Sequence, residues 1–367
     1  MKPKAIYFYQ YLPPWRIDVF NEIAKHYDLT IVFTNAELEG FKYNRKLLLS
    51  QLKNIKTIFL NNGFKIGSRP VRFGIYKIIQ EIKPDIIFSH EYSPTSILVA
   101  LYRQLRIFNY KYVITTSDNQ QMAESVKGAK SIFRSYVLNH SDGIIVYSDS
   151  VKRWYESNFP KLQIEICPNI QAPETLLKYR ADFPPIIESY KKKFGLEGEK
   201  VMLYVGRLVH VKGLDLLLDA FSKTSLDYKL VIVGEGAREN DLKMQVETLG
   251  IGERVVFAGG YSGANLYAWY DIANFFILPS RYEPFGAVVN EALIYGCPVV
   301  ASKHMGAVDF INEDNGVLFD PNDKNEFIRT LNKAFTIYNN DNIVRKNLMF
   351  HSFEEYVKVF NKFDIKR

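Results

Sequence analysis

The chain has 367 residues, of which 47% are hydrophobic and 24% charged, and its formal net charge is +7. This composition is typical of a globular protein, and the length favours two domains. The two cysteines, Cys167 and Cys297, lie far apart in the sequence, which excludes a disulfide framework and indicates a cytoplasmic compartment.

The N-terminal residues MKPKAIYFYQYLPPW place two lysines before an apolar run, as a signal peptide does. The run is short, is interrupted by Gln10 and is followed by no small-residue cleavage site, so we predict a first β-strand instead. No apolar segment approaches the length of about 18 residues that would span a bilayer. Any membrane contact is therefore expected to be peripheral, with the protein at the inner face of the plasma membrane.

The positive charge is concentrated in the first half of the chain. Residues 1–172 hold 23 Lys and Arg against 14 Asp and Glu, whereas residues 173–367 hold 24 against 26. A basic half suggests an anionic partner. Basic and apolar residues alternate in Leu98 to Tyr112 (LVALYRQLRIFNYKY), which suits an anionic membrane surface as well as it suits ordinary solvated surface. No zinc-ligand spacing or RNA-binding motif supports a nucleic-acid partner.

Strands and helices alternate along residues 1–172, which we assign to an N-terminal domain. The predicted strands are Ala5 to Tyr9, Leu29 to Phe33, Thr57 to Leu60, Ile86 to Ser89, Tyr112 to Thr115 and Gly143 to Tyr147. The predicted helices are Ile17 to His26, Phe73 to Ile82, Pro94 to Phe108 and Ser131 to Asn139. This alternation predicts parallel βαβ units in a doubly wound α/β sheet, with ligands beyond the carboxyl ends of the strands.

Residues 173–199 interrupt the pattern with Pro184-Pro185 and a run of three lysines, and we read them as an interdomain linker followed by a helix. Alternation resumes over residues 200–349, the predicted second domain. The expected strands are Val201 to Val205, Lys229 to Val233, Val255 to Ala258, Phe275 to Leu278, Pro298 to Ala301 and Gly316 to Phe319. The expected helices are Leu214 to Phe221, Asn240 to Leu249, Leu266 to Ile272 and a segment from about Phe285 to Gly296, with a last helix over Phe350 to Phe363.

One phosphate-binding element is predicted after the first strand of the second domain. Gly206-Arg207-Leu208 is followed by Lys212-Gly213 and a helix. Glycine lets the backbone approach a ligand, and two cations beside a helix N-terminus suit a phosphate. The alternative is that both cations are surface or capping residues.

The stretch RYEPFGAVVNEALIYGCPVVAS, Arg281 to Ser302, carries a second element. Backbone N–H groups of Phe285, Gly286, Ala287 and Val288 begin a predicted helix and lack intrahelical partners, so they can bind a phosphate. Glu283 precedes the helix and Glu291 lies on its first turns, and carboxylates accept hydrogen bonds from sugar hydroxyls. The alternative is that both glutamates are solvated charges on a helix. Their occurrence together with the Arg207 and Lys212 element favours a nucleotide-sugar site.

The spacing of Glu283 and Glu291, followed by Gly296-Cys297-Pro298-Val299-Val300-Ala301-Ser302, resembles the retaining glycosyltransferases of family 4, the glycosyl transferases group 1. The resemblance is strong over residues 200–320 and weak before them. It implies the GT-B fold: two Rossmann-like domains facing each other across a cleft, the first (residues 1–172) binding the acceptor and the second (residues 200–349) binding the nucleotide sugar. It also implies that the C-terminal helix, residues 350–367, crosses back to the first domain.

The resemblance also implies roles for single residues. Arg207 and Lys212 would bind the donor diphosphate, Glu283 the donor sugar and Glu291 the ribose. Gly206 and Gly234 would let the backbone approach the nucleotide, and Tyr261 would contact the base. The catalytic group would comprise Glu283, Arg207 and Lys212. No Asp-x-Asp motif occurs, so we expect no metal and no other cofactor.

The first domain departs from the family pattern. It has Gln10-Tyr11-Leu12-Pro13-Pro14-Trp15-Arg16 in place of a glycine-rich loop, and Ser117 before Asp118 where a His-Asp pair is frequent. Arg16, His90 and Asp118 are the acceptor-side candidates, although a lone loop histidine is more often structural. His140, His210 and His304 give no metal-ligand spacing.

These observations predict a retaining, metal-independent glycosyltransferase. Its donor would be a UDP- or GDP-sugar and its acceptor a saccharide or a lipid-linked saccharide, in the biosynthesis of a bacterial surface polysaccharide such as capsule, exopolysaccharide or lipopolysaccharide. The alternatives are a GT-B nucleotide-sugar epimerase and a non-catalytic partner that binds nucleotide sugars. The sequence names neither the base, the sugar, the acceptor nor the linkage.

Overall fold

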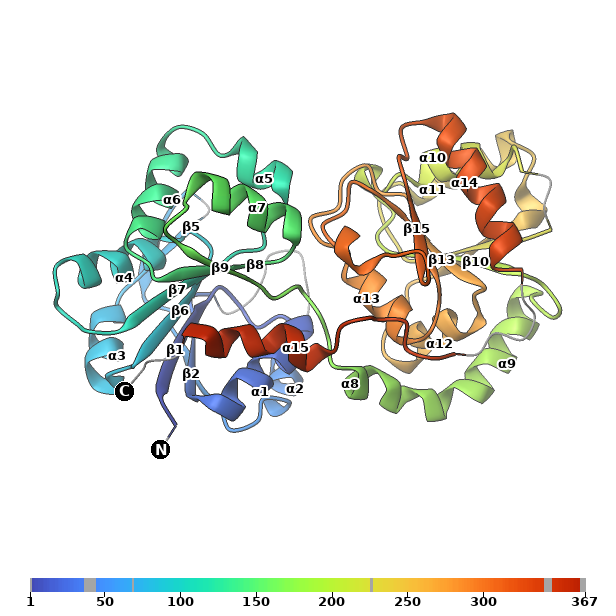
Figure 1. Cartoon of the computed structure of the whole chain (residues 1–367). Coiled ribbons are helices and arrows are strands. Elements are labelled where there is room, and N and C mark those ends of the chain that lie inside the picture. The colour runs from blue at the N-terminus through green and yellow to red at the C-terminus, as the bar shows by residue number, and fades with distance from the viewer. Residues whose placement is uncertain (1, 36–43, 68, 225–226, 340–344, 364–367) are drawn as a thin grey trace. The chain divides into compact units, whose positions relative to one another are not determined.

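The structure is a computed structural model that describes residues 2–35, 44–67, 69–224, 227–339 and 345–363. The chain divides into two compact units, Met1–Gln171 with His351–Arg367, and Ala172–Phe350 (Figure 1). Each unit has its own parallel sheet covered by helices, as the alternating pattern predicts. No helix in the described part of the chain has both the length and the apolar character that a membrane span requires.

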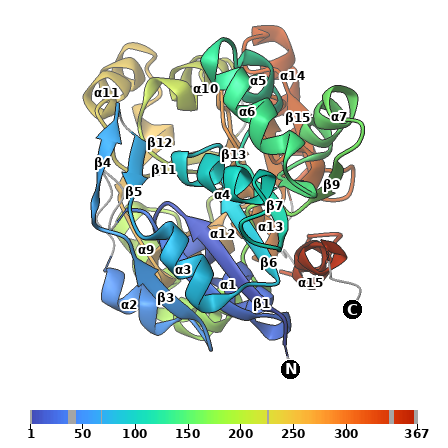
Figure 2. The same cartoon turned by 90° about the vertical axis from the view of Figure 1, so that its left-hand side faces the viewer.

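The first unit contains a seven-stranded parallel sheet in the order β3-β2-β1-β6-β7-β8-β9. Its strands are β1 (Lys4–Tyr9), β2 (Asp28–Phe33), β3 (Lys56–Phe59), β6 (Ile86–His90), β7 (Lys111–Thr115), β8 (Gly143–Val146) and β9 (Gln163–Ile166). Its helices are η1 (Pro14–Arg16), α1 (Ile17–His26), α2 (Arg45–Ser50), α3 (Ile75–Ile82), α4 (Pro94–Gln104), α5 (Gln120–Ser125), α6 (Ala129–Asn139) and α7 (Asp149–Asn158). An antiparallel hairpin, β4 (Gly63–Ile66) and β5 (Arg69–Arg72), stands outside the main sheet (Figure 2).

The chain's C-terminal segment completes the first unit, as the resemblance implies. Helix α15 (Phe353–Val357) begins with a capping box at Ser352 and continues as the 3₁₀ helix η6 (Lys358–Phe363). Phe360 is fully buried against Phe88 of β6 and Tyr7 of β1, and its carbonyl oxygen accepts a hydrogen bond from the Tyr27 hydroxyl.

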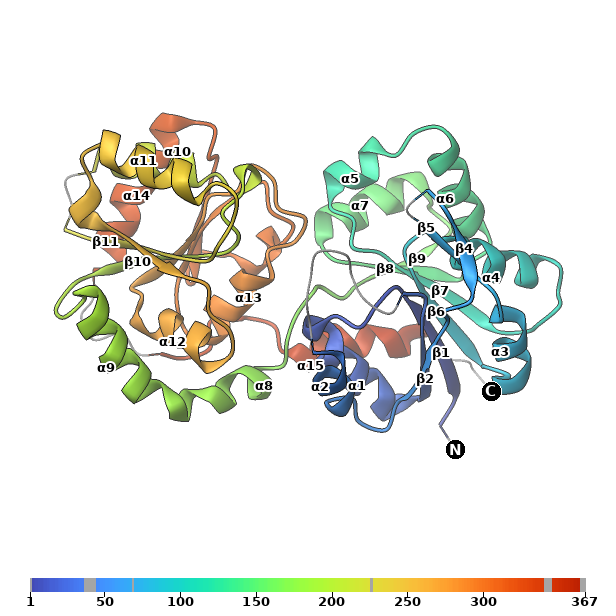
Figure 3. The same ribbon diagram turned by 180° about the vertical axis from the view of Figure 1, so that it is seen from behind.

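The second unit contains a six-stranded parallel sheet in the order β12-β11-β10-β13-β14-β15. Its strands are β10 (Val201–Val205), β11 (Lys229–Val233), β12 (Val255–Gly259), β13 (Phe275–Leu278), β14 (Val299–Ser302) and β15 (Gly316–Phe319). Its helices are α8 (Pro173–Leu177), η2 (Lys178–Asp182), α9 (Phe183–Phe194), η3 (His210–Lys212), α10 (Leu214–Phe221), α11 (Glu239–Thr248), η4 (Gly252–Arg254), α12 (Ala264–Ile272), α13 (Ala287–Ile294), η5 (Val308–Phe310) and α14 (Lys324–Ile337). Helices α9 and α12 pack side by side on one face of this sheet (Figure 3).

Several predicted helix boundaries are wrong, and at two of them a left-handed glycine accounts for the later start. The helix predicted from Phe285 begins at Ala287, because Gly286 has a left-handed backbone with φ 97°. The helix predicted to reach Phe108 ends at Gln104, and Arg106 then adopts a positive φ. The helix predicted from Phe73 begins at Ile75, after Gly74 with φ 94°. The C-terminal helix begins at Phe353, three residues later than predicted.

Candidate functional site

The predicted donor residues gather where the strand order of the second sheet reverses. Strand β10 lies between β11, which follows it along the chain, and β13, so the loops after β10 and β13 leave in opposite directions. In open α/β sheets ligands bind at such a switch point. The loop after β10 carries Arg207 and Lys212, and the loop after β13 carries Glu283.

The two loops are fastened to each other. A Cβ atom added to Gly213, whose φ is 68°, would lie 2.1 Å from the carbonyl oxygen of Pro279, so only glycine permits this approach. Arg281 donates to both carboxylate oxygens of Asp215, at 2.6 Å and 2.7 Å, and its backbone N–H donates to the carbonyl of Val211 at 2.9 Å. Burial raises the pKa of Asp215, but the bonds to Arg281 outweigh it and leave that pKa below its usual value.

Lys212 and Glu283 form an ion pair between these loops, in which the Lys212 ammonium donates to Oε2 of Glu283. Only 15% of the lysine side chain and 11% of the glutamate side chain are exposed. The backbone of Glu283 is held on both sides, because its N–H donates to His304 and its carbonyl accepts from Gly306. The structure thus brings together the cation and the carboxylate that the sequence assigns to diphosphate and sugar.

Helix α13 begins directly after this pair, at Ala287, and its first N–H groups point away from the helix toward its N-terminal side. Ala287 and Val288 are half-buried and Phe285 is buried. Glu291 follows one turn later and accepts a hydrogen bond of 3.0 Å from the hydroxyl of Tyr270. Burial and the Glu291 carboxylate raise the pKa of Tyr270, so this phenol stays a donor.

The remaining donor candidates lie on neighbouring loops of the same unit. A Cβ atom on Gly234 would lie 1.9 Å from the carbonyl oxygen of Gly206, so these two loops also approach through glycine. Arg207 is exposed, and its carbonyl accepts from the Tyr204 hydroxyl at 3.0 Å. The ring of Tyr261 packs at 5.2 Å from that of Tyr190 on α9.

A second candidate site lies within the first unit. A pocket of about 280 Å³ opens beside the corresponding switch point, between β1 and β6. Asp118 lines it, and so do Glu91 and Tyr92 after β6. The pocket lies beyond the carboxyl ends of these strands, which is where ligands bind in open α/β sheets.

The other two acceptor-side candidates do not line this pocket: Arg16 is buried, and His90 is half-buried with its Nε2 3.5 Å from Oε1 of Glu91. The Arg16 side chain is 1% exposed; its Nη1 donates to the carbonyl of Pro168 at 3.4 Å, and its guanidinium lies 5.9 Å from the ring centre of Tyr147. The ring of His90 stacks on that of Tyr9 with centroids 4.2 Å apart, and its Nδ1 lies 3.1 Å from the Thr115 hydroxyl. Burial, followed by the positive charge of Arg16, lowers the pKa of His90 to about 3.

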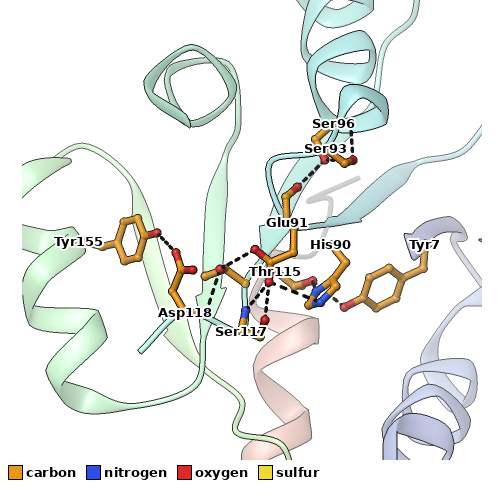
Figure 4. Close-up of polar contacts among 10 residues, drawn as sticks. Tyr7, His90, Glu91, Ser93, Ser96, Thr115, Ser117, Asp118 and Tyr155 are labelled. Carbon is orange, nitrogen blue, oxygen red and sulfur yellow. Dashed lines mark hydrogen bonds and ion pairs between the residues drawn. The ribbon is translucent and has the colours of Figure 1, made fainter. Parts of the chain in front are cut away.

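Sequence reasoning missed the residues that surround Asp118. Glu91 has a left-handed backbone with φ 61°, which is unusual for a residue with a side chain. Its Oε1 accepts from the N–H and the hydroxyl of Ser117 at 2.8 Å and 2.5 Å (Figure 4). The hydroxyl of Tyr155 on α7 donates to Oδ2 of Asp118 at 3.0 Å. The available signal was the position of Glu91, which directly follows a strand at the switch point.

Within the described residues no group of three or more His, Cys, Asp and Glu side chains is arranged to hold a metal ion.

Comparisons with known proteins agree on the second unit. Residues 186–348 match the family described as Glycosyl transferases group 1. Mannosylfructose-phosphate synthase of Agrobacterium fabrum is 38% identical over 157 residues, which are 40% of this chain and 34% of that protein. The similarity to this first relative thus spans about a third of the relative's length.

More distant similarity extends over both units. The lipopolysaccharide 1,2-N-acetylglucosaminetransferase of Salmonella typhimurium is 28% identical over 282 residues, covering 71% of this chain and 69% of that protein. The solved structure of Anabaena HepE in complex with UDP superposes with a TM-score of 0.71 at 18% identity, covering 98% of this chain and 96% of that one. Such structural neighbours have the GT-B fold, which is therefore the fold of this chain.

Proposed function

Because residues 186–348 belong to the glycosyl transferases of group 1, we propose that this chain is a retaining glycosyltransferase. It transfers a sugar from a UDP- or GDP-sugar to a saccharide or a lipid-linked saccharide. The complex of HepE with UDP and the activity named for the Salmonella relative support a nucleotide-sugar donor.

The observation that carries the proposal is the buried pair of Lys212 and Glu283 at the switch point of the second sheet. A buried cation and carboxylate are costly to remove from water, so the fold stabilises them with specific contacts. The two loops that carry the pair are held together by the ion pair of Arg281 with Asp215 and by the close approach of Gly213 to Pro279. Next to the pair, the N-terminus of α13 supplies N–H groups for a phosphate.

The reaction divides among these groups. The bond between the anomeric carbon and the diphosphate oxygen breaks, and negative charge develops on the diphosphate, where Arg207, Lys212 and the N-terminus of α13 stabilise it. Glu283 holds hydroxyls of the donor sugar, and Glu291 holds the ribose. The acceptor oxygen bonds to the anomeric carbon on the face that the diphosphate leaves, and its proton passes to a departing phosphate oxygen. The configuration is thereby retained with no separate general base.

Cationic side chains and backbone N–H groups suffice for the diphosphate, so the proposed reaction is metal-independent. Its product is a bacterial surface polysaccharide, made at the inner face of the plasma membrane. Exposed apolar side chains beside basic residues in the first unit support peripheral contact with anionic lipid; among them are Phe64, Ile66, Leu105 and Ile107.

A thermal-shift series tests the proposal. UDP, GDP, ADP and dTDP are added without metal to the wild type and to Lys212→Ala, with Lys243→Ala on the exposed face of α11 as the matched control. We expect one nucleotide to raise the melting temperature of the wild type and of the control but not of Lys212→Ala. A shift that requires a divalent metal would overturn metal independence. Binding by the wild type without transfer to any acceptor would favour the non-catalytic partner.

A further inference from the structure

The pocket in the first unit has a floor and a rim of opposite charge. Asp118, only 7% exposed, and Glu91 lie on its inner side, together with Tyr92. Arg69 and Lys130, which are exposed, line its outer side. The pocket's volume of about 280 Å³ lies near the lower limit of small-molecule sites, roughly 300–1,000 Å³, so it has room for one sugar-sized ring.

The floor is held rigidly by a network of hydrogen bonds (Figure 4). The hydroxyl of Tyr155 donates to Asp118 and lies 2.8 Å from the hydroxyl of Tyr92. Oε1 of Glu91 accepts from Ser117, and its Oε2 accepts from the Thr116 hydroxyl at 3.3 Å. The positive φ of Glu91 costs free energy and persists only because these contacts hold the residue in place.

Glu91 is fixed through its backbone as well. Its N–H donates to the carbonyl of Thr115 at 2.8 Å, and its carbonyl accepts from the hydroxyl of Ser96 at 2.6 Å. The loop that bears Asp118 therefore cannot move away from β6 without losing several hydrogen bonds at once. A prepared floor with two carboxylates suits a ring that offers several hydroxyl hydrogens.

The rim of the pocket carries two cationic side chains, Arg69 and Lys130, that can bind an anionic group of the ligand. Nη1 of Arg69 donates to the carbonyl of Tyr92 at 2.9 Å, which orients this guanidinium beside the floor. Lys130, in the first turn of α6, lines the same pocket as Arg69 of strand β5. Guanidinium and ammonium groups bind phosphate and carboxylate groups. The two cations Arg69 and Lys130 therefore suit a ligand that carries an anionic group better than one that carries only neutral hydroxyls.

We propose that this pocket binds one sugar ring of the acceptor, that the hydroxyls of this ring donate to Asp118 and Glu91, and that the ring carries an anionic substituent bound by Arg69 and Lys130. The inference rests on the proposed function, because it makes this site the acceptor subsite of the same enzyme. It restricts the acceptor to phosphorylated or acidic saccharides.

Ligand-observed NMR on the full chain tests the inference with four probes: glucose, glucose 6-phosphate, glucuronate and inorganic phosphate. The measurements use the Lys212→Ala background, so that anions do not report on the donor site of the second unit. We expect the two anionic sugars to bind about fivefold or more tighter than glucose, and inorganic phosphate alone to bind more weakly than either. Equal binding of glucose and the anionic sugars would overturn the inference.

Two matched pairs of variants locate the binding. Lys130→Ala is expected to abolish the preference for anionic sugars, whereas Lys127→Ala, an exposed lysine outside the pocket lining, is expected to preserve it. Asp118→Asn is expected to lower the affinity for every sugar about tenfold. Glu124→Gln on α5, outside the pocket lining, is expected to leave these affinities unchanged. Equal losses in both members of a pair would show nonspecific attraction and contradict the assignment.

The two hypotheses fail separately. If the wild type shows no nucleotide-induced shift but the probes bind as described, the proposed transferase function is wrong and the pocket is still a site for acidic sugars. If nucleotides bind and the four probes do not, the proposed donor site is supported and the inference about the acceptor pocket is wrong.

Discussion

Glu283 has two partners in the proposed cycle, Lys212 before the donor binds and the donor sugar afterwards. In the structure its carboxylate accepts from the Lys212 ammonium. A diphosphate that attracts Lys212 would release this carboxylate for sugar hydroxyls, so that binding of the diphosphate prepares the sugar subsite. In the proposed cycle this pair would link diphosphate binding to sugar binding.

The variant Glu283→Gln tests this division of roles. We expect the transfer rate to fall about 100-fold, because a charge-assisted hydrogen bond to the donor sugar is lost, with nucleoside diphosphate affinity within a few-fold of the wild type. Isothermal titration with the diphosphate and a transfer assay measure the two quantities. Glu239→Gln on α11 is the control, and an equal loss of both quantities in Glu283→Gln would show that Glu283 serves the diphosphate itself.

His90 predicts a pH dependence of stability. Its pKa is about 3 in the folded protein and about 6.5 when unfolded, so its contribution is fully present above pH 6.5 and is lost as pH falls toward 3. In His90→Phe, which can still stack on Tyr9, this titration is absent. Between pH 7 and pH 4 we expect the free energy of unfolding of the wild type to fall by roughly 3 kcal/mol more than that of the variant.

Urea unfolding of both proteins across this pH range measures the difference. A constant difference in the free energy of unfolding between pH 7 and pH 4 would show that His90 titrates alike in both states.

At the scale of elements, the approach of the loop after β10 to the loop after β13 depends on Gly213. Gly213 and Gly250 share nearly the same backbone, with φ 68° and 67°, but a Cβ atom on Gly250 meets nothing within 4 Å. Alanine at either position should lower the free energy of unfolding by about 1 kcal/mol, because a residue with a Cβ atom is strained in the left-handed conformation. We expect Gly213→Ala to lower the melting temperature further and to abolish nucleotide binding, because its Cβ would force Pro279 away.

Gly250→Ala should bind nucleotide as the wild type does. Thermal unfolding with and without nucleotide separates the two variants. Nucleotide binding by Gly213→Ala equal to that of Gly250→Ala would show that the approach of the loops does not shape the donor site.

The sequence predicted the central elements well and the peripheral ones poorly. Buried parallel strands such as β10 and β11 are continuous apolar runs, and the structure confirms them at their predicted positions. Helix α14 and strand β9 were not predicted, because β9 carries Gln163 and Glu165 at the edge of its sheet and α14 has only a polar-dominated amphipathic pattern. The boundary errors at Gly74 and Gly286 arose where a left-handed glycine begins the helix.

The residues of the candidate donor site were easier to predict from the sequence than those of the proposed acceptor pocket. Arg207, Lys212, Glu283 and Glu291 belong to two short motifs whose spacing is legible without a structure. The pocket in the first unit joins loops after β1, β6 and β7 to α5 and α6, and sequence alone does not show that Glu91 fastens the Asp118 loop. Side-chain partners so far apart in the chain are fixed by the tertiary fold.

At the scale of the whole molecule, Phe360 gives the C-terminal segment a measurable role in the first unit. Replacing this buried ring by alanine should destabilise the first unit by about 3–5 kcal/mol through lost burial and a cavity. Calorimetry with the stabilising nucleotide should show a lowered transition for the first unit and an unchanged nucleotide-dependent transition for the second. Phe133→Ala, at an exposed ring of α6, is the control; loss of the nucleotide-dependent transition in Phe360→Ala would contradict this assignment.

The return of the chain's end to the first unit has a consequence for biosynthesis. Strand β1 leaves the ribosome well before Phe360, whose ring packs against Tyr7 and Phe88, because the whole second unit lies between them in the sequence. The second unit, Ala172–Phe350, is contiguous in the sequence, whereas the first unit is complete only after the segment that follows the second unit has also been translated. A product truncated before Phe360 leaves apolar surface on β1 and β6 uncovered, and proteases and chaperones can then distinguish it from a chain that contains Phe360.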